Sequence, residues 1–568
     1  MANRNPEATW QYHNATKHSY WSVRTNPHRL DWANQPLPFK IYPSLEPLPL
    51  PREWPPTGMP ALLAIASAAA APQQEVVPDL KTLASILHFS AGISRRKTYP
   101  GGEIFFRVAS CTGALYEIEL YLVSGELADL PAGVYHFNPA DFALRKLRKG
   151  DYRPVLAEAT AEEPSVVHAP LTIVCTATYW RNAWKYQART YRHFGWDNGT
   201  ILANLLAMCA ALRLPARVLC SFVDSEVNRL LDLDTEREVA FSMVPLGYIS
   251  GVPPEPPKEM APLGLETLPL SRTEVDYPTM REMHEASSLH SEEEAAAWCA
   301  QPLVAELSAP TGHTVPLQLL SEEEMSRDPI ERVIFRRGST RKFAQEPITF
   351  AQLSTMLDRS GRGIPADFLN PYGAQLNDMY LIVHAVEGLT PGAYVFHRRR
   401  GVLECLKERN FRSEAYFLGL EQELPAEASV AVFFLADLHV VLEHLGNRGY
   451  RAVQLEAGIL GGKLYLAAYA QRLGATGLTF FDDDVTTFFS PRGRQVCDFP
   501  HGTRQEREAK RTLTGRREPH QASQEKLYTQ LLGTLPLPST TFRPPRHCVS
   551  RMLCPIWRPV LGSIRNFP

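Results

Sequence analysis

One segment of the chain gathers charged donors around a small polar residue. RRGSTRKF, residues 336–343, places three arginines around a serine, directly before the expected helix TFAQLSTMLDRSG. Guanidinium groups offer forked, charge-assisted donors that suit a phosphate or the carbonyl oxygens of a ring. By composition alone, such arginines are more often plain surface charge. The candidate ligand-binding residues in this segment are Arg336, Arg337, Ser339 and Arg341.

Two further segments are loops of small residues. RVASCTGALYEIELYL, 107–122, runs into a strand, and small side chains there let backbone amides approach a flat or anionic ligand. RLGATGLTFFDDD, 472–484, has the same character, although such a loop can equally cap a helix. The candidate residues are Arg107, Ser110, Cys111, Thr112, Gly113 and Ala114 in the first loop and Gly474, Ala475, Thr476 and Gly477 in the second.

The chain contains an internal repeat with a constant offset of 259 residues. Residues 121–153 align with 380–412, and residues 189–224 align with 448–483 without a gap. One register held over two separate blocks, with a period too long for a solenoid, indicates two copies of one domain fused in tandem.

Each copy predicts the same α+β pattern. We expect strands at 119–123 and 133–137, a short helix, an apolar strand at 171–177, a long helix opening near Gly199 and a final strand at 218–222. The second copy predicts the corresponding elements, with its long helix opening near Gly458 and its last strand at 477–481.

The predicted organisation has five parts. An N-terminal extension covers 1–60, the first domain 61–250 and the second domain 329–503. Between the domains, 251–328 is rich in proline and reads as a linker with local acidic helices capped by Ser291 and Ser321. The basic segment 504–568 repeats nothing and is predicted to be a disordered tail.

A fourth segment with chemical potential belongs to one copy alone. WKYQARTYR, 184–192, places Lys185 beside Tyr186, where the second copy has His444 and Leu445. A solvated lysine next to a half-buried tyrosine is the plain interpretation of such a pair. Whatever these two residues do is specific to the first copy.

The composition excludes several classes of function. The 568 residues carry 59 Lys+Arg against 61 Asp+Glu, so no overall field attracts nucleic acid or an anionic membrane. We also expect no membrane segment, no secretory signal, no disulfide framework and no metal site, because the nine cysteines have no regular spacing. The expected location is the cytoplasm.

Together the four segments resemble the nitroreductase superfamily, and within it the tandem form of the SagB/ThcOx-type dehydrogenase branch. RRGSTRKF resembles the RRSxRxF opening, LPAGVYHFNP the GLxPGVYxYxP hairpin, and KYQARTYRHFGWDNG the KYxxRxxRyxxxExGH stretch. RVASCTGALYEIELYL resembles RxxPSAGALYPxELYL, departing from it at Ser110, Cys111, Thr112 and Glu117.

The resemblance implies FMN bound between two domains, so that a tandem chain forms an internal pseudo-dimer. One domain would supply the arginine motif and the loop after the long helix, and the other the PSAG-like loop. An alignment of the preceding helices places Ser67, Ala69 and Ala71 where the second copy has its arginine motif, and the PSAG-like loop of the second copy has diverged to NPYGAQLN. We therefore expect one composite FMN site rather than two.

By the same resemblance, Lys185 and Tyr186 act in catalysis. The implied function is an FMN-dependent oxidoreductase that desaturates a C–N or C–C bond of a small-molecule or peptide-derived substrate and passes hydride to FMN, with NAD(P)H or oxygen as the redox partner. Two alternatives remain open: an NAD(P)H-dependent nitro or quinone reductase, and a degenerate, non-catalytic flavin-fold binding protein.

Overall fold

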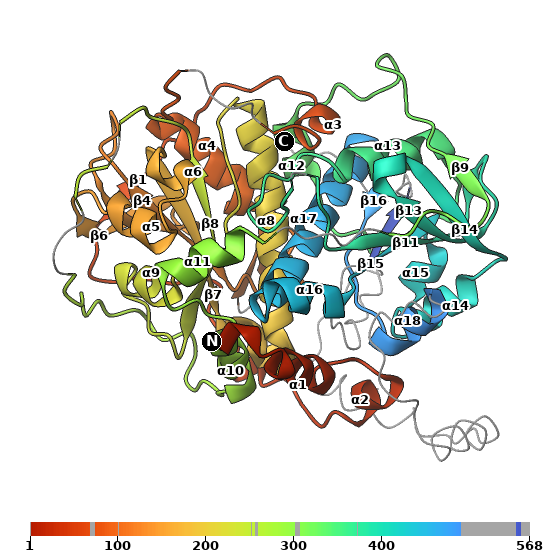
Figure 1. Cartoon of the computed structure of the whole chain (residues 1–568), viewed down its shortest axis with the longest axis horizontal. Helices are drawn as coiled ribbons and strands as arrows, with labels where there is room; N and C mark the ends of the chain where they lie inside the picture. Colours follow the sequence, from red (N-terminus) through yellow and green to blue (C-terminus); the bar gives the residue numbers. More distant parts are fainter. Residues whose placement is uncertain are drawn as a thin grey trace. The chain divides into compact units, whose positions relative to one another are not determined.

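The computed structural model describes residues 2–68, 74–99, 102–251, 253–255, 260–301, 307–371, 373–489 and 553–557. The chain divides into two compact units, 1–496 with 549–568, and 497–548. All described residues belong to the first unit (Figure 1). The aligned residues Ala69 and Ala71 lie outside the described residues.

Each half of the first unit is built on one antiparallel sheet. The sheet of the first half has the order β1-β6-β5-β4-β7-β8 and that of the second β16-β17-β15-β11-β13-β14-β9. The first sheet comprises β1 (Pro47–Pro49), β4 (Ile118–Ser124), β5 (Gly133–Asn138), β6 (Ala143–Lys149), β7 (Leu171–Thr178) and β8 (Glu238–Leu246). The second comprises β9 (Thr314–Pro316), β11 (Asp378–Val383), β13 (Gly392–His397), β14 (Val402–Glu408), β15 (Val430–Leu435), β16 (Gly474–Ala475) and β17 (Leu553–Trp557). Two short pairs, β2 (Ile93–Tyr99) with β3 (Gly102–Arg107) and β10 (Ile348–Thr349) with β12 (Val386–Glu387), stand apart from these sheets.

The helices surround the sheets and separate the two halves. Those up to residue 230 are α1 (Glu7–Ala15), α2 (Tyr20–Thr25), α3 (Ala61–Ala64), α4 (Leu80–Ala91), α5 (Arg153–Ala159), α6 (Pro164–Val167), α7 (Tyr179–Tyr186), α8 (Thr190–Ala211) and α9 (Asp224–Leu230). The others are α10 (Pro278–Ala286), α11 (Glu292–Cys299), α12 (Ile330–Arg336), α13 (Phe350–Ser360), α14 (Arg412–Leu418), α15 (Glu423–Glu427), α16 (Leu438–Leu445), α17 (Arg448–Ala470) and α18 (Asp482–Phe489).

The pairing register confirms the repeat. Tyr121 of β4 pairs with His136 of β5, and Tyr380 of β11 pairs with Val395 of β13, both exactly 259 residues later. The predicted fold, two fused α+β domains of one kind, is therefore correct. The long helices α8 and α17 pack against each other between the two sheets (Figure 1).

Several predicted elements were wrong in their limits. Both long helices begin earlier than expected, at Thr190 and Arg448, because Gly199 and Gly458 lie in the helix interior where the two backbones approach closely. The predicted strands 218–222 and 477–481 are irregular, with single bridges such as Leu219 to Met243. Strands β6 and β14 were not predicted, because polar residues on both of their faces obscure the alternating pattern.

The linker and the tail also differ from expectation. Ser291 caps α11 as predicted, accepting a hydrogen bond from the Glu294 amide, whereas Ser321 opens only a turn. Residues 553–557, inside the predicted disordered tail, form β17, which pairs antiparallel with β15. In this position β17 corresponds to β8, which pairs with β7 in the first half. Within the described residues, no helix combines the length and hydropathy needed to cross a membrane.

Candidate functional site

The arginine motif follows α12 and reaches across to the first half. Arg337 donates from Nε to the carbonyl oxygen of Val108 at 2.8 Å. A side chain of the second half therefore binds the start of the loop 107–114 in the first half. Burial lowers the pKa of Arg337 below its usual value. Its guanidinium also lies 5.4 Å from the ring centroid of Tyr465.

The two neighbouring arginines have different roles in the structure. Arg336 forms an ion pair with Asp328 at 2.8 Å and donates to the Tyr469 carbonyl at 2.7 Å, so it fastens α12 to α17. Arg341 is exposed and has no ion-pair or hydrogen-bond partner within the described residues. Of the arginines in this motif, Arg341 is thus the one whose guanidinium group has no partner within the described residues.

The loop after α17 lies directly against the arginine motif. The Thr340 amide donates to the carbonyl oxygen of Ala475 at 2.9 Å. The Tyr465 hydroxyl lies 3.2 Å from the Ser339 hydroxyl and accepts the amide of Gly477. Gly474 must be a glycine, because a Cβ there would lie 2.4 Å from the Thr340 hydroxyl oxygen. These contacts bring together two segments that are more than 130 residues apart in the sequence.

One buried polar atom in this loop, the hydroxyl oxygen of Thr476, has no hydrogen-bond partner within the described residues. The Thr476 side chain is 1% exposed. A buried hydroxyl without a partner is costly in a folded protein, and it is a common mark of a group that pairs with a ligand.

The first-half loop forms a tight turn that faces Tyr186. Gly113 has φ +66°, in the left-handed region that glycine tolerates best, and Ala114 has φ +55°. A Cβ on Gly113 would lie only 2.8 Å from the Tyr186 hydroxyl oxygen. The Ser110 carbonyl accepts the Thr200 hydroxyl of α8 at 2.6 Å. The turn is therefore positioned between Tyr186 and α8.

Lys185 and Tyr186 end helix α7. The Lys185 ammonium lies 5.2 Å from the ring centroid of Tyr186, and the side chain of Tyr186 is buried. The Tyr186 ring packs edge-on against His193 at 4.8 Å. Burial, followed by the nearby Arg189, holds the pKa of His193 well below its usual range, so this imidazole is neutral.

The N-terminal extension runs along the same segment. His28 donates its Nε2 proton to the Trp184 carbonyl at 3.0 Å, and Asn26 donates to the Gln187 side chain at 2.8 Å. Tyr12 donates its hydroxyl to the Ala188 carbonyl at 2.6 Å. The extension therefore forms a wall beside Lys185 and Tyr186.

The predicted site residues thus divide into two groups. The structure brings together Arg337, Ser339, the loop 474–477 and the start of the loop 107–114, and separately it joins that loop to Tyr186. Arg107 supports the loop instead, donating from Nη2 to the Pro38 carbonyl at 2.8 Å. Two residues of these contacts were not predicted from the sequence: Tyr465, and Asp197, which accepts the Thr112 amide. An acid recurs at the position 259 residues after Asp197, Glu456.

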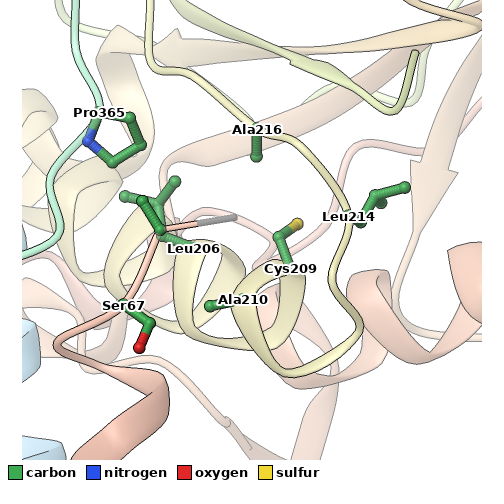
Figure 2. A pocket seen from close by; sticks show the side chains of 8 residues that line it. Ser67, Leu206, Cys209, Ala210, Leu214, Ala216 and Pro365 are labelled. Carbon is green, nitrogen blue, oxygen red and sulfur yellow. The ribbon is translucent and has the colours of Figure 1, made fainter. Parts of the chain in front are cut away.

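The pseudo-equivalent position in the first half is filled. Ser67 stands there in place of Arg337, and Leu206 and Ala210 stand where α17 has Tyr465 and Tyr469. The remaining pocket holds about 10 Å³, roughly the space of one water, and Pro365 closes it from the second half (Figure 2).

The loop that contains Pro365 is also bound tightly to the first half. The Val218 amide donates to the Pro365 carbonyl at 2.8 Å. The Asp367 carboxylate accepts the amides of Cys220 at 2.8 Å and of Ser221 at 2.7 Å. These bonds hold the Pro365 loop against the first half, next to the small pocket.

Comparisons with known proteins agree with the repeat. The model of the Nitroreductase family matches residues 73–248 and 334–498. A protein of Methanocaldococcus jannaschii whose name includes the word nitroreductase is 26% identical over 184 residues, 31% of this chain and 89% of that protein. The trifolitoxin-processing protein TfxB of Rhizobium leguminosarum bv. trifolii is 31% identical over 149 residues, which cover 25% of this chain and only 40% of TfxB.

A solved structure extends the similarity to most of the chain. A crystal structure from Anabaena variabilis, also of a protein named as a nitroreductase, superposes with a TM-score of 0.68 at 26% identity and covers 85% of this chain and 96% of that one. With the family model matching both halves, this chain belongs to the nitroreductase family.

Proposed function

We propose that the chain is an FMN-dependent oxidoreductase with one composite flavin site. The observation that carries the proposal is the bond between Arg337 of the second half and the Val108 carbonyl of the first, which joins the arginine motif to the turn that faces Tyr186. Among the described residues, the pseudo-equivalent position has Ser67 in place of Arg337, beside Leu206 and Ala210, and Pro365 lines the same small pocket.

The residues present fit FMN. The exposed Arg341 offers an unused guanidinium for the phosphate. The loop 474–477, whose Ala475 carbonyl accepts the Thr340 amide, adds the buried hydroxyl of Thr476, which has no partner within the described residues. The small residues of the turn, Gly113 above all, let the backbone approach a flat ring. When bound, FMN would supply a ring that accepts hydride from the substrate.

The chain's own residues would prepare the substrate. Lys185 is the candidate general base and takes a proton from the substrate, and Tyr186 relays or holds that proton at its hydroxyl. The N-terminal wall contacts the end of α7 at the Trp184 carbonyl, and the ring of His193 packs against Tyr186, so both restrict the orientation of this pair. The proposed reaction is desaturation of a C–N or C–C bond, as in the SagB/ThcOx branch.

The choice of a peptide-derived substrate follows from the SagB/ThcOx resemblance, and the partial similarity to TfxB, a protein named for the processing of trifolitoxin, is consistent with it. The pair of Lys185 and Tyr186 supports the same choice, since it is present in one half only. An NAD(P)H-dependent reductase would need no such pair.

The first test is the flavin content of the purified protein. We expect a yellow protein that releases one FMN per chain on acid treatment. Two flavins per chain, or a colourless protein that does not bind added FMN, would overturn the proposal. Arg341→Ala should lose FMN, whereas Arg400→Ala, an exposed arginine of the second half far along the chain, should retain it.

The second test separates the dehydrogenase from the reductase. Rapid anaerobic bleaching of the flavin by NADPH would support the reductase. Slow bleaching, together with loss of substrate oxidation in Lys185→Met and Tyr186→Phe at unchanged FMN content, would support the proposed dehydrogenase.

A further inference from the structure

A thiol and two carboxylates meet at the turn 112–114 of the first half. The Cys111 sulfur lies 3.2 Å from Oδ2 of Asp197 and 3.4 Å from Oε2 of Glu117. One sulfur or oxygen atom from each of these three residues lies within 4.8 Å of the other two. Cys111 and Glu117 stand on either side of the turn and Asp197 comes from α8, so a loop and a helix together form this thiol–carboxylate cluster.

The Glu117 carboxylate points into the cluster and has unused bonding capacity. The side chain of Glu117 is fully buried, and its Oε1 has no hydrogen-bond partner within the described residues. Oε2 of the same carboxylate lies against the Cys111 sulfur. A buried carboxylate oxygen without a donor is costly in a folded protein, and an ion at the site is one of the usual reasons for it.

The second half places an arginine beside the acid that corresponds to Asp197. That acid, Glu456, forms an ion pair with Arg398 at 3.2 Å. In the first half, neither Glu117 nor Asp197 forms an ion pair within the part of the chain that the structure describes. The arginine of the same loop, Arg107, donates to the Pro38 carbonyl instead. Because buried charges in proteins are paired or bind metals, the cluster lacks a cation that its counterpart has.

The distances in the cluster suit a small divalent metal with tetrahedral ligands. Zinc binds a thiolate sulfur at about 2.3 Å and a carboxylate oxygen at about 2.0–2.2 Å, so neighbouring sulfur and oxygen ligands stand about 3.5 Å apart. The two sulfur–oxygen distances here, 3.2 and 3.4 Å, differ from that value by a few tenths of an ångström. A thiolate among the ligands favours zinc over magnesium or calcium, which take oxygen ligands.

Hydrogen bonds from the loop orient two of the three candidate ligands. The Thr112 amide donates to both carboxylate oxygens of Asp197 at 2.9 Å, and the Thr112 hydroxyl donates to Oδ1 at 2.9 Å. The Tyr116 amide donates to the Cys111 sulfur at 3.0 Å. Metal ligands in proteins are normally held by outer bonds of this kind, which fix their direction and favour their anionic forms.

We propose that Cys111, Glu117 and Asp197 bind one zinc ion, with water at its fourth position. Cys111 is the half-buried member of the cluster, so an ion can enter from its side. The ion ties the turn 112–114 to α8 and thereby helps to set how close Gly113 lies to Tyr186. The expectation of no metal site rested on the spacing of the cysteines, which cannot reveal ligands that stand 86 residues apart.

The first test is the zinc content of the purified full chain. The protein is incubated with zinc, freed of excess metal by gel filtration and analysed by mass spectrometry of the elements. We expect one zinc per chain in the native protein and none above background in Cys111→Ser and in Glu117→Gln. Cys405→Ser, at a half-buried thiol of the second half, and Glu126→Gln, at an exposed acid of the first, should keep the native value.

A second test needs no substitution and therefore does not depend on whether a variant folds. Iodoacetamide alkylates free thiolates, and coordination to zinc protects them. In the native chain, we expect zinc to slow the alkylation of Cys111 at least about tenfold relative to the chain stripped with EDTA, as followed by peptide mass spectrometry. Cys405 is the internal reference and should react at the same rate with and without zinc.

A third test concerns the outer bonds. Thr112→Val removes the hydroxyl that donates to Oδ1 of Asp197 and leaves the amide in place. We expect it to weaken zinc binding by roughly 10–100-fold, as measured by competition with a zinc-binding dye. Unchanged affinity would remove Asp197 from the ligands and overturn the three-residue site.

Three other results would overturn the zinc site. A native chain without zinc would mean that the three groups only bond to one another. Zinc that is retained equally in Cys111→Ser and in Glu117→Gln would place the metal elsewhere in the chain, and equal alkylation of Cys111 with and without zinc would show that its sulfur is not a ligand. Zinc binding does not depend on flavin, so a colourless protein that holds one zinc at Cys111 would contradict the proposed function and leave this site intact.

Discussion

Gly199 of the first half lies against Gly458 of the second, so closely that a Cβ on Gly199 would come within 2.5 Å of the Gly458 Cα atom. The two glycines are the same position of the repeat, 259 residues apart. A residue can touch its own counterpart only on a twofold axis, so the pseudo-dimer axis passes between them. The two halves therefore meet as the subunits of a symmetric dimer would.

Buried ion pairs between the two halves stabilise the contact across this axis. Arg451 and Arg448 of the second half donate to Asp224 of the first at 2.8 and 2.6 Å, and Arg192 of the first half donates to Asp482 of the second at 2.9 Å. Although burial opposes it, the two arginines hold the pKa of Asp224 well below its usual range.

We expect Asp224→Asn to lower the free energy of unfolding by about 3–5 kcal/mol, because two buried guanidinium groups would lose their counter-charge. Urea denaturation measures this. Glu226→Gln, which removes an exposed partner of Arg229, should cost less than about 1 kcal/mol. A small effect at Asp224 would show that water or another group replaces the carboxylate.

A second prediction concerns the orphaned hydroxyl of Thr476. Thr476→Val keeps the shape and removes the buried oxygen, so the flavin-free protein should be unchanged or more stable by about 1 kcal/mol. If that hydroxyl donates to FMN, the same change should weaken FMN binding by roughly tenfold. Thr479→Val, at a second buried hydroxyl without a partner within the described residues, is the matched control. Lower stability with unchanged FMN affinity would contradict this role.

The sequence predicted the repeat and the strands that carry it, because identities at one offset survive in the paired strands of each sheet and in the two long helices that pack against each other. It could not predict where α8 begins, since the reason that Gly199 stays helical is a contact with a residue 259 positions away. The arginine motif was recognisable, but the use of Arg336 in an ion pair with Asp328 depends on how α12 packs. The contact between the Cys111 thiol and Oε2 of Glu117, at 3.4 Å, was hidden for the same reason, because in the sequence each residue is an isolated departure from the PSAG-like pattern.

A third prediction follows from the loop that closes the second position. Burial raises the pKa of Asp367 to about 6, against the two amides that stabilise its charge. Because the native carboxyl then holds its proton more tightly than the unfolded one, stability is greatest below about pH 4 on this account and falls as the pH rises to about 6.

Asp367→Asn should remove that pH dependence. Relative to the native protein, the free energy of unfolding of the variant should therefore increase by roughly 1–3 kcal/mol as the pH rises from 4 to 7. Chemical denaturation at several pH values measures the difference. Asp129→Asn, at an exposed carboxylate, should leave the pH dependence as it is. If the free energy of unfolding depends on pH in the same way in the native protein and in Asp367→Asn, another group causes the effect.

A fourth prediction separates backbone strain from contact at Gly113. Gly113→Ala should cost about 1–2 kcal/mol for its positive φ, as at any such position, and more for the Cβ that would lie 2.8 Å from the Tyr186 hydroxyl. Gly401→Ala supplies the first cost alone, because Gly401 has φ +61° and nothing within 4 Å of the added Cβ. The excess at Gly113 should shrink but not vanish when Tyr186→Phe removes the hydroxyl, because Cε2 of the ring and Cδ1 of Leu115 still lie 3.2 and 3.3 Å from the added Cβ. Equal losses of unfolding free energy at the two glycines, with or without that hydroxyl, would mean that the turn moves freely away from Tyr186, and then neither residue could fix the other.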